Sequence, residues 1–283
     1  MDLRLDGRVA VVAGASRGIG LATGRMLARE GARVALVARD AVTLRAATDG
    51  ANANGAAAGD GVAGVGVTDT DGAGTGAAGV GVGVGVAEAF VCDLSDRKRV
   101  AELPAEVERR LGPAQILVLN AAAPAEFARW PTRGGAAFED LVAASLRLVA
   151  APLEAFTPAL AACGHGRVIV IGSLAGQLGA VGQAPYATGK AALVGLVRTL
   201  ALELGAEGVT VNLVLPGAVD TERLAAVLTA SARAAILRRT ALGRLATPDE
   251  VAAVVTFLVS DAAAAITGAT LPVTCGYELN ERW

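Results

Sequence analysis

Seven short apolar runs, most of them separated by stretches with helical spacing, restrict the fold of this chain more than any other feature. The runs are continuous rather than alternating, which is typical of strands buried on both faces of a parallel sheet. They are Arg8–Ala13, Arg33–Ala38, Ala89–Cys92, Ile116–Leu119, Val168–Ile171, Thr210–Val214 and Thr270–Val273. The pattern predicts a doubly wound α/β fold, and the length of 283 residues favours one large domain over residues 1–283.

A low-complexity segment interrupts this pattern between about residues 49 and 86. It consists almost entirely of Gly, Ala, Val, Asn, Asp and Thr, and it ends in the Gly–Val alternation of residues 79–86. Such small side chains offer little area to offset the entropy lost on ordering the backbone, so we expect a loose surface insertion without a catalytic role. The alternative is a strand with one valine face, or a segment that docks on another subunit.

The turn after the first apolar run carries three glycines, in the order Gly14-Ala15-Ser16-Arg17-Gly18-Ile19-Gly20. Glycine permits a tight turn there and lets the backbone approach a pyrophosphate at a helix N-terminus. Many strand-to-helix loops use glycine only to turn, but the position of this one within a βαβ unit favours a dinucleotide site. We therefore predict a Rossmann-type domain whose cofactor contacts include Gly14, Ser16, Arg17, Gly18, Ile19 and Gly20.

The end of the second run, Ala38-Arg39-Asp40, bears on the choice of cofactor. An acidic residue there accepts hydrogen bonds from the ribose hydroxyls of NAD, whereas arginine pairs with the 2′-phosphate of NADP. Arg39 and Arg17 together can form a two-arginine clamp, and Asp40 lies one position late for the acidic role. The sequence predicts NADP(H) rather than NAD(H); the alternative is that both arginines are solvated surface charges.

Three residues near the fifth run have the chemistry of carbonyl reduction. Ser173 follows this run, and Tyr186 and Lys190 lie four residues apart, on one face of a helix. The reaction needs an acid at the oxygen, and a neighbouring lysine cation lowers the pKa of tyrosine from its usual value of about 10. Serine adds a hydrogen bond where negative charge develops. Each residue alone has a structural explanation, so the combination with the glycine turn carries the prediction.

These motifs resemble those of the short-chain dehydrogenase/reductase family, and most closely those of its 3-oxoacyl-[acyl-carrier-protein] reductases. The resemblance covers nearly everything outside residues 49–86 and rests on Gly14 to Gly20, Asp93-Leu94, Asn120-Ala121-Ala122, Ser173, Tyr186 with Lys190, Pro216-Gly217 through Thr221, and Gly243-Arg244 with Pro248-Asp249-Glu250-Val251. It implies that Asp93, beside Leu94, contacts the adenine, and that Lys190 contacts the nicotinamide ribose as well as Tyr186. It further implies an adenosine-side contact by Asn120, Ala121 and Ala122, and a nicotinamide-side contact by Pro216, Gly217, Val219 and Thr221.

Three positions depart from the family pattern. Ser145 stands where the family normally has an asparagine that anchors a water linking the lysine to solvent. One hydroxyl replaces an amide with two donors and an acceptor, so we expect an altered proton relay that still includes Ser145. The other departures are Leu119-Asn120-Ala121-Ala122 for the usual Asn-Asn-Ala-Gly, and a C-terminal turn, Val273-Thr274-Cys275-Gly276-Tyr277, that lacks the usual paired glycines.

Composition excludes several other classes of protein. The 25 basic and 27 acidic residues give a net charge of −2, which favours neither nucleic acid nor an anionic membrane as a partner. Cys92, Cys163 and Cys275 are far apart and form no metal-binding or disulfide pattern. The charged N-terminus lacks a signal-peptide core, and no later stretch is a convincing membrane span, so we expect a cytoplasmic protein without a metal.

The prediction for function is NADPH-dependent reduction of a ketone, with a 3-oxoacyl or polyketide-type compound as the candidate substrate. The substrate would bind at the carboxyl ends of the strands, under a lid formed by about residues 219–242. The partners predicted are a small carbonyl compound, free or carried by a carrier protein, and further copies of the chain in a homodimer or homotetramer. Two alternatives use the same site: a secondary-alcohol dehydrogenase, and a cofactor-binding or partner subunit with weak catalysis.

Overall fold

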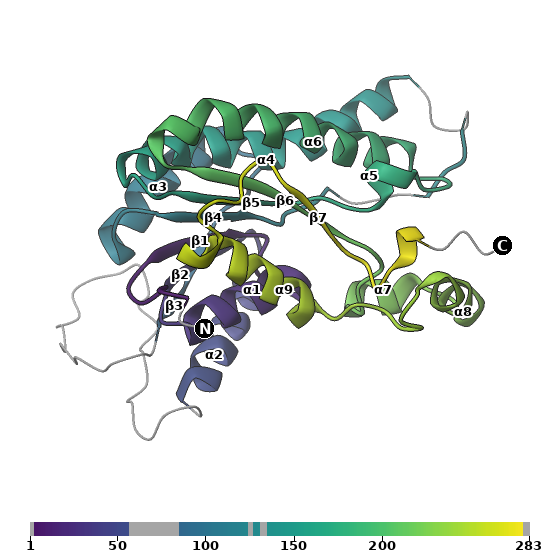
Figure 1. Cartoon of the computed structure of the whole chain (residues 1–283), viewed down its shortest axis with the longest axis horizontal. Coiled ribbons are helices and arrows are strands. Elements are labelled where there is room, and N and C mark those ends of the chain that lie inside the picture. The colour runs from purple at the N-terminus through teal and green to yellow at the C-terminus, as the bar shows by residue number, and fades with distance from the viewer. Residues whose placement is uncertain (1–2, 57–84, 124–126, 131–134, 280–283) are drawn as a thin grey trace.

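The seven apolar runs form the strands of one parallel sheet (Figure 1). The strands are β1 Val9–Ala13, β2 Arg33–Ala38, β3 Ala87–Val91, β4 Ile116–Leu119, β5 Arg167–Ile171, β6 Thr210–Pro216 and β7 Thr270–Val273. Their order across the sheet is β3-β2-β1-β4-β5-β6-β7. The winding reverses between β1 and β4, which confirms the doubly wound, Rossmann-type α/β fold. The structure is a computed structural model and describes residues 3–56, 85–123, 127–130 and 135–279.

Helices form a layer on each face of the sheet. Helices α1, α2 and α9 cover one face and α3, α4 and α6 the other, while α5, α7 and α8 lie beyond the carboxyl ends of the strands (Figure 1). Their bounds are α1 Gly18–Arg29, α2 Ala41–Ala56, α3 Arg97–Leu111, α4 Ala136–Ala162, α5 Ala175–Leu178, α6 Ala184–Leu204, α7 Glu222–Val227, α8 Ala230–Arg239 and α9 Pro248–Val259, with the 3-10 helices η1 Gly205–Glu207, η2 Asp261–Ala263 and η3 Tyr277–Leu279.

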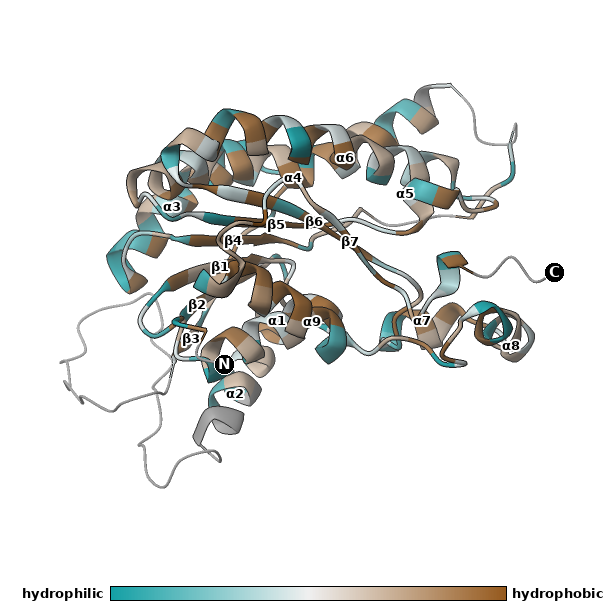
Figure 2. Ribbon diagram, viewed as in Figure 1, coloured by the Kyte–Doolittle hydropathy of each residue, from teal (hydrophilic) through white to brown (hydrophobic). Residues whose placement is uncertain are grey.

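The two layers explain why the strands are apolar throughout. In β1, Val9, Val11 and Ala13 join the core beneath α3, α4 and α6, whereas Ala10 and Val12 join the core beneath α1 and α9. Successive side chains of a strand point to opposite faces, so a strand covered on both sides needs an apolar residue at every position. Figure 2 shows this as hydrophobic colour along the central strands.

The first part of the low-complexity segment is helical and not the loop that was expected, because α2 extends through Ala56. Leu44, Ala47 and Ala51 are buried at helical spacing, and this apolar stripe continues the helix into residues expected to be a loop. At the other end, the backbone N–H of Gly85 donates to the carbonyl oxygen of Ala28 at 3.1 Å. The rest of the predicted insertion, residues 57–84, lies outside the described part of the chain.

Asn52 connects the two ends of this segment. Its side-chain amide accepts from the backbone N–H of Ala87 and donates to the carbonyl oxygen of Ala87, each at 3.1 Å. The pair fastens α2 to the start of β3. The last described turn of α2 and the start of β3 are therefore held close together.

Helix α4 is long and apolar enough to cross a membrane by length and composition. Within this protein it packs instead against α3, α6 and β4. Val149, Leu153, Phe156 and Leu160 from α4 are buried in the core of the domain. The helix is therefore part of the domain, although only 28 % of its most apolar window is buried within the chain.

The predicted lid is helical. Thr221 caps α7 by accepting from the N–H of Leu224 at 3.2 Å, and Thr229 caps α8 by accepting from the N–H of Ala232 at 3.2 Å. The two ends of this segment meet where the N–H of Asp220 donates to the carbonyl oxygen of Ala246 at 2.8 Å. The segment therefore projects from a closed base at the carboxyl end of the sheet.

Candidate active site

The glycine turn between β1 and α1 is packed too tightly for side chains. Gly14 has a φ of +79°, and a Cβ atom there would lie 2.8 Å from the backbone of Ala121. A Cβ atom on Gly20 would overlap the carbonyl oxygen of Gly14, to which Asn120 Nδ2 donates at 2.9 Å. The turn thus packs directly against Asn120 and Ala121, two residues that were also predicted to contact the cofactor.

The start of α1 has free donors for an anion. Arg17 occupies the N-cap position in an extended conformation and makes no side-chain hydrogen bond to the helix. The first N–H groups of a helix lack partners within it, and the helix dipole favours negative charge there. Arg17 is exposed at this turn, whereas Ser16, Gly18 and Ile19 are half-buried. The residues present therefore fit the pyrophosphate of a dinucleotide.

Asp40, at the end of β2, is influenced by two arginines and by Thr43. Hydrogen bonds from Thr43 are the main cause of the lowered pKa of Asp40, and the charges of Arg17 and Arg39 lower this pKa further. The N–H of Thr43 donates to Asp40 Oδ1 at 2.7 Å, so this carboxylate is engaged at the start of α2. Both arginine charges therefore act on the carboxylate of Asp40 at the end of β2.

The charge of Arg39 also acts on Asp93, which follows β3. The pKa of Asp93 is lowered chiefly by hydrogen bonds from the backbone and side chain of Ser95, and also by the charge of Arg39. The Ser95 donors lie 2.9 and 2.8 Å from Asp93 Oδ1. Asp93 is exposed and Leu94 is 5 % exposed, so the carboxylate of Asp93 is open to solvent whereas Leu94 is part of the core.

Tyr186 and Lys190 lie together on α6, as predicted. The Lys190 ammonium is 5.9 Å from the centroid of the Tyr186 ring, and Nζ donates to the carbonyl oxygen of Ile171 at 2.7 Å. Lys190 is 6 % exposed, and burial lowers the pKa of its ammonium to about 8. Ser173 follows β5, and its hydroxyl oxygen accepts from the N–H of Ala175 at 3.2 Å. The serine thus keeps its own proton available for another acceptor.

Ser145 lies beside the catalytic helix α6 and makes a hydrogen bond within its own helix. It lies on α4 against α6, where a Cβ atom on Gly189 would be 2.9 Å from Ser145 Cβ. Its hydroxyl donates to the carbonyl oxygen of Leu141 at 2.9 Å, within its own helix. Its single proton is therefore directed to the backbone of α4, while its side chain packs beside Gly189, the residue before Lys190.

The residues expected at the nicotinamide end lie at the carboxyl end of β6. Pro216 ends this strand, and the N–H of Gly217 donates to the carbonyl oxygen of Val273 at 3.1 Å. Val219 is 6 % exposed. Thr221 Cγ2 would lie 3.4 Å from a Cβ atom on Gly18, which brings this segment to the glycine turn. Ala122 is exposed at the end of β4, whereas Ala121 is half-buried.

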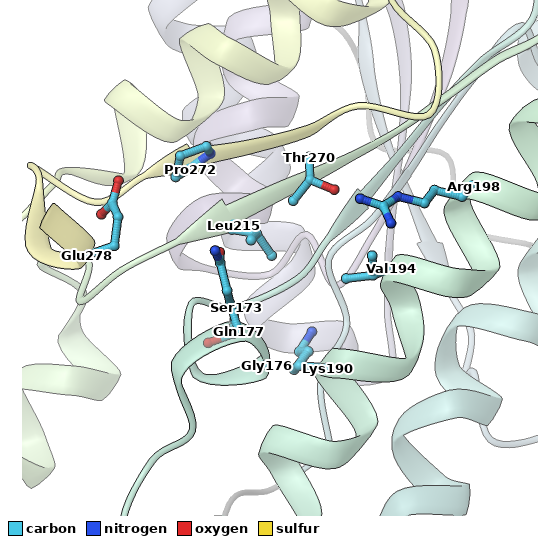
Figure 3. Close-up of a pocket in the computed structure, with 10 residues that line it drawn as sticks. All are labelled: Ser173, Gly176, Gln177, Lys190, Val194, Arg198, Leu215, Thr270, Pro272 and Glu278. Carbon is cyan, nitrogen blue, oxygen red and sulfur yellow. The ribbon is translucent and has the colours of Figure 1, made fainter.

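A cavity of about 430 Å³ lies between α6 and the strands β6 and β7, next to Ser173 and Lys190 (Figure 3). It is lined by Ser173, Gly176, Gln177, Lys190, Val194, Arg198, Leu215, Thr270, Pro272 and Glu278. Sequence reasoning identified only Ser173 and Lys190 among these residues. The composition adds one signal for Lys190. Of the 25 basic residues of the chain only Lys98 and Lys190 are lysines, so a lysine at position 190 stands out among arginines.

The unusual C-terminal turn contains a left-handed residue. Cys275 has a φ of +56°, in the region that favours glycine, and the N–H of Leu242 donates to its carbonyl oxygen at 3.1 Å. Thr274 accepts from the N–H of Gly276 at 3.2 Å and donates to Glu278. Cys275 therefore has a backbone conformation typical of glycine, in a turn that normally carries paired glycines.

The fold and the residues at the carboxyl ends of its strands define a dinucleotide-binding oxidoreductase. Comparison with known proteins narrows this class. The family described as "Enoyl-(Acyl carrier protein) reductase" matches residues 56–278, and the family described as "short chain dehydrogenase" matches residues 8–73. The chain belongs to the short-chain dehydrogenase/reductase family.

Relatives of similar length include reductases and a dehydrogenase. The chain is 32 % identical to the 3-oxoacyl-[acyl-carrier-protein] reductase FabG of Escherichia coli (strain K12), over 97 % of this chain and 98 % of that protein. It is 33 % identical to a putative ketoacyl reductase of Streptomyces coelicolor, with coverage of 96 % and 97 %. It is 34 % identical to the cis-4-hydroxycyclohexanecarboxylate dehydrogenase of Sinomonas cyclohexanicum, with coverage of 95 % and 96 %.

Proposed function

We propose that this protein reduces a ketone to a secondary alcohol with NADPH. The observation that carries the proposal is the buried Lys190 ammonium, held by Ile171 and 5.9 Å from the ring centroid of Tyr186. A cation fixed there stabilises the tyrosinate, so Tyr186 can give up its proton at neutral pH. Ser173 donates a second hydrogen bond to the ketone oxygen as negative charge develops on it.

The cofactor supplies the hydride, and the chain's own residues position it. Gly14, Ser16, Arg17, Gly18, Ile19 and Gly20 hold the pyrophosphate at the uncapped start of α1. Arg39 and Arg17 bind the 2′-phosphate, a role supported by the engagement of Asp40 with Thr43. Asp93, Leu94, Asn120, Ala121 and Ala122 contact the adenosine side. Pro216, Gly217, Val219 and Thr221 contact the nicotinamide side, and Lys190 contacts its ribose.

The reverse reaction is the second candidate. The same residues serve alcohol oxidation with Tyr186 as the base, and the Sinomonas relative is named as a dehydrogenase. Cofactor preference separates the two directions: selectivity for NAD⁺ would favour oxidation, and selectivity for NADPH favours reduction.

The proposed substrate is a 3-oxoacyl or polyketide-type ketone, free or carried by a carrier protein, and we place the reaction in the cytoplasm. The names of the Escherichia coli and Streptomyces relatives support this class of substrate. The outer face of α6 supports a homodimer or homotetramer, because Ala191, Ala192 and Gly195 are exposed and Leu202 is 85 % exposed. Light scattering on the purified protein tests the assembly.

Oxidation of NADPH in the presence of a panel of free and carrier-bound ketones tests the reaction. We expect turnover by the wild type and a loss of at least a hundredfold in Tyr186→Phe, which keeps the ring but cannot donate the proton. NADPH binding should stay within a few fold of the wild type in this variant. Absence of NADPH oxidation across the panel, or equal rates for the two proteins, would contradict the proposal.

Arg39→Ala tests the cofactor preference. The loss of a charge-assisted contact worth about 1.5–3 kcal/mol should weaken NADPH binding by roughly ten- to a hundredfold and change NADH binding less than twofold. Arg109→Ala removes an exposed arginine from α3 and is the matched control. Equal losses for both cofactors would refute the 2′-phosphate clamp.

A further inference from the structure

The lid helices depend on other segments for their position. Helices α7 and α8 lie beyond the carboxyl ends of the strands (Figure 1), and the described part of the chain buries no residue of either helix. A helix of ten residues, the length of α8, is only marginally stable in water without tertiary contacts. The contacts at the two ends of the lid therefore decide how firmly it is held.

The base of the lid is closed beside the proposed cofactor site. The N–H of Asp220 donates to the carbonyl oxygen of Ala246 at 2.8 Å, and Val219 forms a parallel bridge with Ala246. Thr221 Cγ2 would lie 3.4 Å from a Cβ atom on Gly18, in the glycine turn. The base is thus fixed by backbone contacts, and the position of α8 depends on what its last turn contacts.

The last turn of α8 is fastened to the C-terminal turn, taken here as residues 274–279. The guanidinium carbon of Arg239 lies 4.4 Å from the centroid of the Tyr277 ring, which is a cation–π contact. Just after α8, the N–H of Leu242 donates to the carbonyl oxygen of Cys275 at 3.1 Å. A side-chain contact and a backbone hydrogen bond therefore join the lid to this turn.

The backbone of the C-terminal turn approaches the lid closely. Cys275 and Gly276 both have left-handed φ values, of +56° and +76°. A Cβ atom on Gly276 would lie 2.6 Å from Ala241 Cβ, closer than two non-bonded carbon atoms approach. Tyr277, the next residue, is half-buried, whereas Arg239 is exposed on the lid. The ring therefore belongs to the fixed part of the domain and the guanidinium to the lid.

The same turn also contacts the catalytic end of the domain. A Cβ atom on Gly217 would lie 3.1 Å from Thr274 Cα, and the N–H of Gly217 donates to the carbonyl oxygen of Val273 at 3.1 Å. Thr274 is 6 % exposed and donates to Glu278, which lines the same cavity as Ser173 (Figure 3). One short segment therefore contacts the lid, the proposed nicotinamide side and the cavity.

We propose that the C-terminal turn is the latch of the lid and that Tyr277 is its positioning residue. The ring of Tyr277 holds Arg239, and with it α8, over the bound NADPH and ketone. This inference rests on the proposed function, since the lid affects turnover only if these molecules bind beneath it. Loss of the contact lets α8 swing outward about the base at Asp220 and Ala246. A cation–π contact between an exposed arginine and a half-buried ring shifts this equilibrium by about fivefold.

Steady-state kinetics with NADPH and a ketone test the latch. Tyr277→Leu removes the ring, so we expect KM for the ketone to rise about fivefold and kcat to stay within about twofold, because the closed lid stabilises bound ketone and transition state equally. Tyr277→Phe keeps the face of the ring and should match the wild type. Arg239→Gln should match Tyr277→Leu, and the double variant should be no worse than either. Arg223→Gln removes an exposed arginine from α7 and is the matched control.

Hydrogen exchange of the cofactor-free protein gives a readout that does not depend on activity. A detached α8 loses its helix, so its amides exchange through detachment. Tyr277→Leu and Arg239→Gln should speed exchange of the α8 amides by about fivefold, whereas Tyr277→Phe and Arg223→Gln should leave it unchanged. Peptides from α9 should exchange at one rate in all five proteins, which shows that the rest of the domain is intact.

The outcomes are distinct. Unchanged exchange of α8 in Tyr277→Leu, a defect in Tyr277→Phe, or additive effects of Tyr277→Leu and Arg239→Gln would each overturn the latch. A fall in kcat with unaltered KM, or faster exchange in α9 as well, would show general damage to the fold and would also overturn it. If the wild type reduces no ketone, the proposed function fails, and exchange of α8 still tests the latch.

Discussion

Replacing Lys190 by methionine should make the protein more stable while it abolishes catalysis. Burial lowers the pKa of this ammonium from its ordinary value of 10.5 to about 8. At about 1.4 kcal/mol for each pKa unit, keeping the charge in the folded protein costs about 3 kcal/mol at neutral pH. Methionine has a similar length and no charge. Loss of the hydrogen bond to the carbonyl oxygen of Ile171 destabilises the variant by about 1 kcal/mol. The free energy of unfolding of Lys190→Met should therefore be about 2 kcal/mol higher than that of the wild type.

The sign of the pH dependence follows from the same pKa values. Below pH 8 the lysine is protonated in both states and its full burial penalty applies. Between pH 8 and 10.5 the folded protein loses the proton before the unfolded chain does, so the wild type gains stability relative to Lys190→Met. The advantage of the variant should therefore shrink between pH 8 and 10.

Urea unfolding of both cofactor-free proteins at pH 7 and pH 10, at one protein concentration, provides the assay. Lys98→Met, which removes the exposed lysine of α3, is the control and should change the unfolding free energy by less than about 0.5 kcal/mol. A variant less stable than the wild type at pH 7, or a difference that does not narrow at pH 10, would refute the reasoning.

Three further predictions concern the backbone. Gly20→Ala should weaken NADPH binding at least tenfold in a fluorescence titration because its Cβ atom overlaps the Gly14 carbonyl oxygen, whereas Gly195→Ala, with no atom within 4 Å, should not. Cys275→Gly should raise the unfolding free energy by about 1 kcal/mol in urea, since it relieves a φ of +56°; a fall would exclude strain there. A short Gly-Ser linker in place of residues 57–84 should leave NADPH affinity and the melting temperature nearly unchanged, because Asn52 and Ala87 already join the ends; loss of cofactor binding would contradict this.

The apolar runs by themselves determined the sheet. Each strand is covered on both faces, so burial requires an apolar side chain at every position. A run of a few consecutive apolar residues is therefore enough to predict such a strand. The seven strands lie where those runs predicted, with bounds that shift by one or two residues. The end of α2 could not be predicted from the sequence. Its Ala- and Asn-rich stretch is helical because Ala51 packs in the core and Asn52 forms hydrogen bonds with Ala87.

The residues of the candidate site likewise fall into those that the sequence predicts and those that only the structure reveals. Gly14 to Gly20, Ser173, Tyr186 and Lys190 could be predicted from sequence because each set lies within one turn, one helix or one strand end, where short spacing fixes geometry. The engagement of Asp40 with Thr43, the bond from Ser145 to Leu141 and the cavity between α6 and β7 depend on side-chain direction and on contacts between segments. The sequence alone predicted which groups do the chemistry. Only the tertiary structure decided which side-chain groups are already hydrogen-bonded and where the cavity lies, because packing between distant segments sets both.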